Sequence, residues 1–347
     1  MSRIAVIGAG AWGTGLSIVL GRGGNHQVRL WAHEKEVRES ISARRMNDLF
    51  LPGQAIPESV FPTGSLEEAL QQADFVVSVM PSQHCRQLFE QMRPHLKPEM
   101  LFVSATKGLE ESTLLRMTEV ISQVISGSGS QKGQADFRPR IAALSGPSFA
   151  KEVARGDPTA ITVASQDAAL AETVQREFSD PRFRIYTNDD VAGVELGGAL
   201  KNVIAIAAGV CDGLGLGHNS VAALITRGLA EMTRLAVACG GRRETMAGLA
   251  GLGDLVLTCT GGLSRNRSVG VELGRGRQLR EIIAGMHGAV AEGVFTTQAA
   301  IGLARARGIE MPITEQMDEI LHRAKAPAEA IRDLMARSGK SEIASSF

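Results

Sequence analysis

Lys201 is the charged residue whose surroundings most favour proton-transfer chemistry. Between Glu195 and Asp212 it is the only charged side chain, and the helix predicted for this segment is apolar on nearly every face. Such a helix is buried. Burial strips water from an ammonium group and can lower a lysine pKa by about 3 to 5, so that the amine exchanges protons near neutral pH. We therefore expect Lys201 to donate or accept a proton; the alternative is a structural lysine paired with a buried carboxylate.

Glycines surround both Lys201 and its expected carboxylate partner. Gly197 and Gly198 stand one turn before Lys201. Each costs about 1 kcal/mol in a helix interior, which indicates that a ligand or another helix packs against the bare backbone. Asp254 ends the glycine-rich segment 248–254, which predicts a tightly folded loop. We expect Asp254 to hold either Lys201 or a substrate hydroxyl group.

The segment 263–268 places two cations where a helix should begin. Ser264 is a typical N-cap, and Arg265, Asn266 and Arg267 follow it in the first turn. Positive side chains oppose the helix dipole there by about 0.3 to 1 kcal/mol each, unless an anion binds at the same place. The pattern predicts a phosphate clamp for the substrate, and the alternative is a basic turn in solvent.

A dinucleotide site is predicted by the glycines of residues 8–13. This GxGxxG directly follows a short apolar strand and opens a helix. Gly8 permits the tight turn, Gly10 lets the backbone approach a pyrophosphate, and Gly13 lets helix and strand pack closely. The helix N-terminus then offers unpaired N–H groups to the anion. Trp12, inside the turn, either contacts the cofactor or serves only to pack the fold.

The residues after the second strand favour NADP over NAD. An NAD site places a carboxylate at the end of this strand, where it accepts a hydrogen bond from the ribose 2′-OH. Here the strand ends in Ala32 and His33, with Glu34 and Lys35 next. His33 and Lys35 would attract a 2′-phosphate, so we expect NADP to be preferred and NAD to be tolerated. The alternative is that Glu34 turns inward to hold a 2′-OH.

Two more groups follow strands of the same half. Lys107 follows the strand 101–104, and Gly146 and Ser148 follow the strand 141–144. Ligands of parallel sheets bind at the carboxyl ends of the strands, although Lys107 would also suit the surface and Ser148 a helix cap. Together with the helical-half residues they would surround a small phosphorylated molecule with a hydroxyl group, beside a nicotinamide.

The elements that position these residues form an α/β half and a helical half. Short apolar strands alternate with helical patterns through the first half, which predicts a doubly wound, Rossmann-type parallel sheet covered on both faces. Strand signals nearly vanish after residue 188, so we expect a dinucleotide-binding domain at 1–188 and an all-α substrate and catalytic domain at 189–347. The expected strands are 3–7, 28–31, 75–79, 101–104, 141–144, 160–164 and 183–186; the expected helices include 66–72, 82–92, 114–125, 191–211, 220–239 and 292–307. Residues 126–134 predict a flexible surface loop, and 338–347 a frayed tail.

Composition excludes several classes of protein. The 347 residues contain 37 Lys+Arg and 37 Asp+Glu, and this balance argues against nucleic-acid binding. Four cysteines without CxxC spacing suit a reducing compartment and give no metal site. The uncharged run 4–21 is broken by glycines into strand, turn and helix, unlike a signal peptide, and we expect no other segment to be long and apolar enough to span a membrane. We therefore expect a cytoplasmic protein, and a helical half with exposed apolar faces makes a homodimer plausible.

These motifs resemble the bacterial NAD(P)-dependent glycerol-3-phosphate dehydrogenase family over nearly the whole chain. The segments that carry the resemblance are 8–14, 51–53, 105–109, 144–150, 195–202, 212–219, 222–232, 248–254, 263–267 and 291–294. Departures are local: Ala11 stands where serine is common, and Gly261 and Gly262 stand where one bulkier residue is usual.

The resemblance implies a role for each matching residue. Lys201 is implied to be the proton donor or acceptor. Residues implied to hold the substrate are Lys107, Gly146, Ser148, Lys201, Asp254, Ser264, Arg265 and Asn266. Residues implied to contact NAD(H) or NADP(H) are Gly8, Gly10, Ala11, Trp12, Gly13, His33, Lys107, Ala150, Arg265, Val290 and Glu292. No metal is implied.

The expected activity is the reversible reduction of dihydroxyacetone phosphate to sn-glycerol 3-phosphate, which supplies glycerophospholipid synthesis. Hydride would come from NAD(P)H while Lys201 protonates the developing alkoxide. A rival enzyme is a β-hydroxyacid or ketopantoate reductase, which would need a carboxylate clamp in place of the turn at Ser264. A rival of another class is a cofactor-sensing protein without catalysis, against which the buried Lys201 and its partner Asp254 argue.

Overall fold

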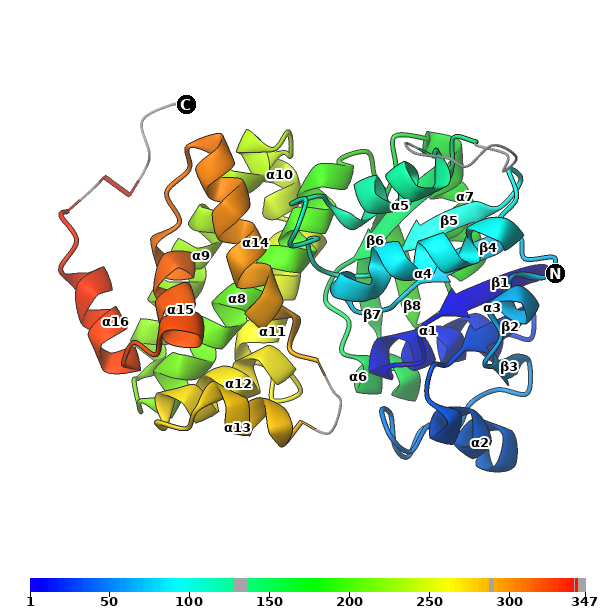
Figure 1. Cartoon of the computed structure of the whole chain (residues 1–347), viewed down its shortest axis with the longest axis horizontal. Helices are drawn as coiled ribbons and strands as arrows, with labels where there is room; N and C mark the ends of the chain where they lie inside the picture. The colour runs from blue at the N-terminus through cyan, green and yellow to red at the C-terminus, as the bar shows by residue number, and fades with distance from the viewer. Residues whose placement is uncertain (128–136, 287–289, 340, 343–347) are drawn as a thin grey trace.

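The computed structural model describes residues 1–127, 137–286, 290–339 and 341–342, and it has two parts (Figure 1). One part is an eight-stranded sheet with helices on its faces, and the other is built of helices around the long central helix α8 (Figure 1). The expected surface loop at 126–134 and the expected C-terminal tail lie largely outside the described residues.

The sheet has the strand order β3-β2-β1-β4-β5-β6-β7-β8. The strands are β1 Ser2–Ile7, β2 His26–Trp31, β3 Val60–Thr63, β4 Phe75–Ser78, β5 Leu101–Ser104, β6 Arg140–Ser145, β7 Thr159–Ala164 and β8 Phe183–Asn188. Every neighbouring pair is parallel except β6 with β7, which is antiparallel. The expected parallel, doubly wound sheet is therefore confirmed, with this pair as its exception. Residues 146–158 connect β6 to β7 and include one short helix, α6, Ala150–Arg155.

Both faces of the sheet are buried, as the apolar strands predict. Along β1, Ile4 and Val6 belong to one apolar cluster, whereas Ala5 and Ile7 belong to another. The first face is covered by α1 Ala11–Arg22, α2 Lys35–Arg44, α6 and α7 Ala168–Phe178, and the second by α3 Leu66–Leu70, α4 Cys85–Met92 and α5 Met117–Ile125. Short 3₁₀ turns occupy Ser82–His84 and Arg93–His95.

The edge strand β3 was not expected from the sequence. Its four residues include Pro62, which lacks an N–H group and is tolerated in edge strands. The β1–turn–α1 unit, by contrast, takes up the uncharged run 4–21 as expected and lies in the core of the sheet part.

The helical part is organised around α8, Val191–Gly213 (Figure 1). This helix is buried along most of its length. The other elements are α9 His218–Ala238, α10 Arg243–Met246, a π-helical turn Leu249–Gly253, α11 Asp254–Thr260, α12 Arg265–Gly274, α13 Leu279–Ala284, α14 Glu292–Arg307, α15 Pro312–Arg323 and α16 Pro327–Met335. Among the described helices, α8 meets the length and hydropathy criteria for a membrane span, contrary to the expectation that no segment would, yet its apolar window is 100% buried inside the protein.

Glycines let α8 and α12 approach backbone to backbone. A Cβ atom at Gly209 would lie 2.0 Å from the carbonyl oxygen of Arg267, and one at Gly270 would lie 2.0 Å from that of Ile206. Neither distance is sterically possible, so both positions require glycine. This contact brings the N-terminus of α12 beside the middle of α8, where Lys201 lies.

Candidate active site between the sheet and the helical part

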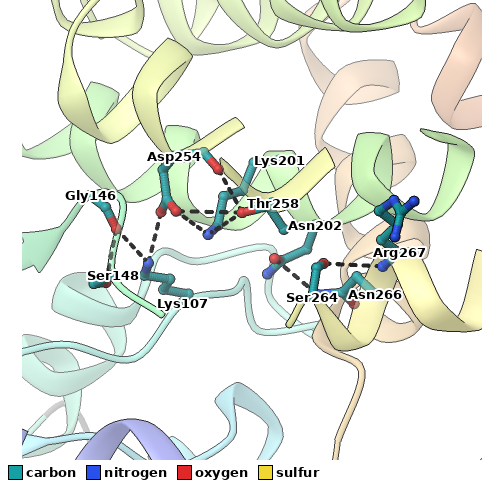
Figure 2. A network of polar contacts seen from close by, with 10 residues as sticks. All are labelled: Lys107, Gly146, Ser148, Lys201, Asn202, Asp254, Thr258, Ser264, Asn266 and Arg267. Carbon is teal, nitrogen blue, oxygen red and sulfur yellow. Dashed lines mark hydrogen bonds and ion pairs between the residues drawn. The ribbon is translucent and has the colours of Figure 1, made fainter. Parts of the chain in front are cut away.

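Lys201 lies buried in the middle of α8, with 6% of the residue exposed. Its Nζ atom donates to Asp254 Oδ1 at 2.5 Å and to Thr258 Oγ1 at 2.9 Å (Figure 2). Burial is the largest influence on the Lys201 amine and lowers its pKa to about 7, with a further lowering by Lys107 and an opposing effect of Asp254. The amine therefore changes protonation state near neutral pH, as its surroundings in the sequence predict.

Asp254 is shared by two lysines. It is the first residue of α11 and is 1% exposed. Its Oδ2 atom accepts a hydrogen bond from Lys107 Nζ at 2.7 Å, while Oδ1 accepts the one from Lys201. Lys107 also donates to the carbonyl oxygen of Gly146 at 3.1 Å, and Ser148 Oγ donates to the same oxygen at 2.9 Å (Figure 2). Residues after β5 and β6 thus join one polar network with residues of α8 and α11.

The glycines before Lys201 serve contacts within the protein. A Cβ atom at Gly197 would lie 2.5 Å from the carbonyl oxygen of Ala250, in the π-helical turn that leads to Asp254. A Cβ atom at Gly198 would lie 2.5 Å from Ser145 Oγ, at the end of β6. Of the two explanations left open by the sequence, close packing of the chain accounts for both glycines. The expected loop before Asp254 is this π-helical turn.

Ser264 caps α12 as expected, since its hydroxyl accepts from the backbone N–H of Arg267 at 3.2 Å. The two cations that follow have different surroundings. Arg267 forms an ion pair with Asp212 at 2.6 Å, whereas Arg265 forms no ion pair with any described residue and is exposed. Arg265 is therefore the cation left to attract an anion at this helix N-terminus.

Both ends of the Asn266 carboxamide form hydrogen bonds within the protein. Its Nδ2 atom donates to Asn202 Oδ1 at 3.0 Å, and its Oδ1 atom accepts from the backbone N–H of Gly293 at 2.9 Å. Asn266 thereby holds α12 against α8 and the start of α14. Asn202 directly follows Lys201, so this group adjoins the lysine network (Figure 2).

The turn of residues 8–13 fits a dinucleotide. Gly8 has φ +122°, and a Cβ atom at Gly13 would lie 1.8 Å from the Gly8 carbonyl oxygen, so neither position accepts a side chain. A Cβ atom at Gly10, by contrast, would meet nothing within 4 Å. No side chain caps the N-terminus of α1. The Trp12 indole N–H is buried without a hydrogen-bond acceptor among the described residues. Open space, free N–H groups and an orphaned donor suit a bound phosphate-bearing cofactor.

The remaining residues implied by the resemblance lie at the same edge or close to it. His33 is exposed just past β2, and Ala150 packs on Gly15 of α1. Glu292, at the start of α14, accepts a hydrogen bond from Ser82 Oγ at 2.9 Å, and burial raises the pKa of its carboxyl to about 7. Val290 is partly buried, two residues before Glu292.

Thr258 and Asn202 belong to the networks but were not singled out from the sequence. Thr258 lies four residues after Asp254 on α11, a spacing that places both on one helix face and was the available signal. Asn202 adjoins Lys201 in a helix otherwise apolar there. Within the described residues, no group of three or more His, Cys, Asp or Glu side chains is placed to hold a metal ion.

Comparison with known proteins agrees with this architecture. Residues 3–171 match the family model described as the NAD-dependent glycerol-3-phosphate dehydrogenase N-terminus, and residues 190–332 match the model of its C-terminus. The chain is 70% identical over 343 residues to the glycerol-3-phosphate dehydrogenase [NAD(P)+] of Koribacter versatilis, covering 99% of each chain. It is 58% identical over 345 residues to the enzyme of the same name from Acidobacterium capsulatum, covering 99% of this chain and 100% of that one.

Solved structures give the same result. The crystal structure of glycerol-3-phosphate dehydrogenase from Coxiella burnetii aligns with a TM-score of 0.90 and 39% identity, covering 97% of this chain and 99% of that one. A ketopantoate reductase from Ralstonia eutropha aligns with a TM-score of 0.57 at 14% identity, covering 95% and 99% of the two chains, so that likeness shows the fold alone. The chain therefore belongs to the NAD-dependent glycerol-3-phosphate dehydrogenase family and is an NAD(P)-dependent oxidoreductase.

Proposed function

We propose that the chain interconverts dihydroxyacetone phosphate and sn-glycerol 3-phosphate with NAD(P)(H), and so supplies glycerol 3-phosphate for phospholipid synthesis. Family membership over the whole chain favours this reaction over ketopantoate reduction. The observation that carries the proposal is Lys201, a buried amine with a pKa of about 7 that is hydrogen-bonded to Asp254, the carboxylate it shares with Lys107 of the sheet part.

Lys201 is the proposed acid and base. Bound nicotinamide cofactor supplies or takes up the hydride at the substrate carbon. In the reducing direction Lys201 donates a proton to the carbonyl oxygen as negative charge develops there, and in the oxidising direction the neutral amine removes the hydroxyl proton. Asp254 orients the amine and balances its charge, and Lys107 brings a second positive charge to the developing oxyanion.

The substrate phosphate is proposed to bind at the N-terminus of α12. The ten-residue helix α12 directs backbone N–H groups toward its N-terminus, and Arg265, which forms no ion pair with a described residue, adds a cation beside them. The proposed substrate-binding residues are Lys107, Gly146, Ser148, Lys201, Asp254, Ser264, Arg265 and Asn266. For Asn266 and Ser264, which bond to the protein itself, the proposed contribution is mainly to hold Arg265 and the helix end in place.

The cofactor is proposed to bind along the carboxyl edge of β1, β2, β4 and β5. The proposed contacts are Gly8, Gly10, Ala11, Trp12, Gly13, His33, Lys107, Ala150, Arg265, Val290 and Glu292. We also propose the domain division at residues 188 and 189. It is supported by the end of β8 at Asn188 and the start of α8 at Val191.

One assay tests the proposed reaction. Purified protein is mixed with NADPH, and absorbance at the nicotinamide band is followed after adding dihydroxyacetone phosphate, ketopantoate or buffer. We expect rapid oxidation of NADPH with dihydroxyacetone phosphate and turnover slower by at least about 100-fold with ketopantoate, because the latter lacks the phosphate for which Arg265 provides a partner. Faster turnover of ketopantoate would refute the proposal, and no turnover with either substrate would refute catalysis.

We further propose a homodimer located in the cytoplasm, with no membrane-spanning segment. Exposed large apolar side chains on the helical part, such as Leu216, Val256 and Phe295, support an interface between copies. The complete burial of the apolar window of α8 supports its role as a core helix. Sedimentation equilibrium at micromolar concentration should give twice the chain mass, and cell fractionation should place the protein with the soluble enzymes; a monomer or a membrane-bound fraction would contradict these proposals.

A further inference from the structure

Arg38 places a guanidinium group at the carboxyl end of β2. It lies on α2, and its Nη1 atom donates to the carbonyl oxygens of Ala32 at 2.7 Å and His33 at 2.9 Å. These are the two residues that follow the strand. The side chain therefore folds back from the helix and lies against the strand end. It approaches the edge of the sheet at which parallel-sheet proteins bind their ligands.

Gly64 makes room for this guanidinium at the end of the neighbouring strand. It directly follows β3, and a Cβ atom there would lie 2.9 Å from both Cζ and Nε of Arg38. The indole N–H of Trp31 donates to the Gly64 carbonyl oxygen at 3.1 Å and holds the backbone in place. The guanidinium is thus seated between the ends of two adjacent parallel strands, against bare backbone.

Arg38 carries an uncompensated positive charge there. It forms no ion pair with any carboxylate in the part of the chain that the structure describes, and among its guanidinium nitrogen atoms only Nη1 has a hydrogen bond to a described residue. Lys35, the other cation at the start of α2, pairs with Glu39 at 3.3 Å on the exposed side of the helix. Arg38 is therefore better placed than Lys35 to bind an anion at the strand end.

We propose that Arg38 binds the 2′-phosphate of NADPH and thereby sets the preference for NADPH over NADH. The inference rests on the proposed function, which requires a dinucleotide along this edge. The ribose of the adenosine half lies past the end of the second strand of such folds, where an arginine accommodates a 2′-phosphate. A planar guanidinium suits phosphate oxygens, and its backbone contacts pre-order it for this contact. Exposed His33 lies on the same edge and adds a second donor.

The test measures binding rather than turnover. Dissociation constants of NADPH and NADH are determined by nicotinamide fluorescence for the native chain, Arg38→Ala, Arg38→Lys, Lys35→Ala and the control Arg44→Ala. Arg44→Ala removes the same charge from the same helix, but the Arg44 side chain pairs with Asp48. We expect Arg38→Ala to weaken the binding of NADPH about 10- to 100-fold and that of NADH less than about 3-fold. The reason is that only NADPH carries the 2′-phosphate, so only NADPH loses a charged hydrogen bond. Arg38→Lys should give an intermediate loss, and Arg44→Ala almost none.

The outcomes separate this inference from the proposed function. Retained NADH binding by Arg38→Ala shows that the variant is folded, so a selective loss of NADPH supports the inference. Equal weakening of both dinucleotides, or unchanged NADPH binding, overturns it even if the native enzyme reduces dihydroxyacetone phosphate normally. If Lys35→Ala weakens NADPH binding as much as Arg38→Ala does, the positive charge of the helix attracts the phosphate without a specific contact to Arg38, and the inference is overturned. A native chain that binds neither dinucleotide contradicts the proposed function as well.

Discussion

Replacing Asp254 by asparagine should move the pH dependence of catalysis to lower pH. The carboxylate is buried and lies 2.5 Å from Lys201 Nζ and 2.7 Å from Lys107 Nζ. Asp254 raises the pKa of Lys201, whereas Lys107 lowers it. Asparagine keeps the shape of the side chain and removes its charge, so the two ammonium groups lose their shared counter-charge and Lys201 releases its proton more readily.

The size of the effect follows from the geometry. Two unit charges at about 4 Å interact by about 4 kcal/mol at an effective dielectric constant of about 20. One pH unit corresponds to about 1.4 kcal/mol, so the loss of Asp254 should shift the titration of Lys201 by about 2 pH units or more. The direction in which each rate changes with pH follows from the proposed role of Lys201, because reduction requires the protonated amine and oxidation requires the neutral amine.

The assay is the pH profile of kcat in both directions. In the native enzyme, reduction should slow and oxidation should accelerate as pH rises through about 7. In Asp254→Asn the fall in the reduction rate and the rise in the oxidation rate should both occur at lower pH, and both rates should be lower overall. The control is Glu231→Gln, which removes a buried carboxylate that bonds to Ile313 and Thr314. If the rates change at the same pH in the native enzyme and in Asp254→Asn, the assignment of the titration to Lys201 is refuted.

Two further predictions concern the ligands. Arg265→Ala should raise the KM for dihydroxyacetone phosphate about 10- to 100-fold, since a charged contact with phosphate is lost; steady-state kinetics checks this, and an unchanged KM would move the phosphate site elsewhere. Gly13→Ala should fail to form the cofactor turn, because the added Cβ would lie 1.8 Å from the Gly8 carbonyl oxygen. The Cβ atom of Gly10→Ala meets open space, so this variant should keep the native Tm while losing NADPH affinity. Thermal unfolding and fluorescence titration of both variants test this difference. Equal Tm values for Gly10→Ala and Gly13→Ala would contradict it.

Local patterns predicted much of the chemistry. An apolar helix with one cation predicts a buried amine, and Lys201 is buried as expected. The GxGxxG spacing predicts a strand, a turn and a helix, because each glycine answers a steric need within a few residues. The helix cap at Ser264 could also be predicted, because its hydrogen bond joins residues only three apart in the sequence.

Long-range pairings could not be predicted in the same way. The spacing of this turn alone does not distinguish Arg265 from Arg267, and only the packing of α12 on α8 pairs Arg267 with Asp212. The contact of Gly197 with Ala250 depends on how the π-helical turn folds against α8. The antiparallel direction of β7 is set by its pairing with β6 across the sheet. Such features arise from tertiary packing, which local spacing does not encode.

The proposed reaction depends on proton transfer by Lys201, and the Lys201→Ala variant tests this role most directly. NADPH affinity and the rate of NADPH oxidation by dihydroxyacetone phosphate should be measured on the same preparation. We expect nearly native NADPH affinity and turnover reduced by about 10² to 10⁴-fold or more, the usual contribution of a positioned proton donor. Turnover close to that of the native enzyme, with NADPH still bound, would contradict the account.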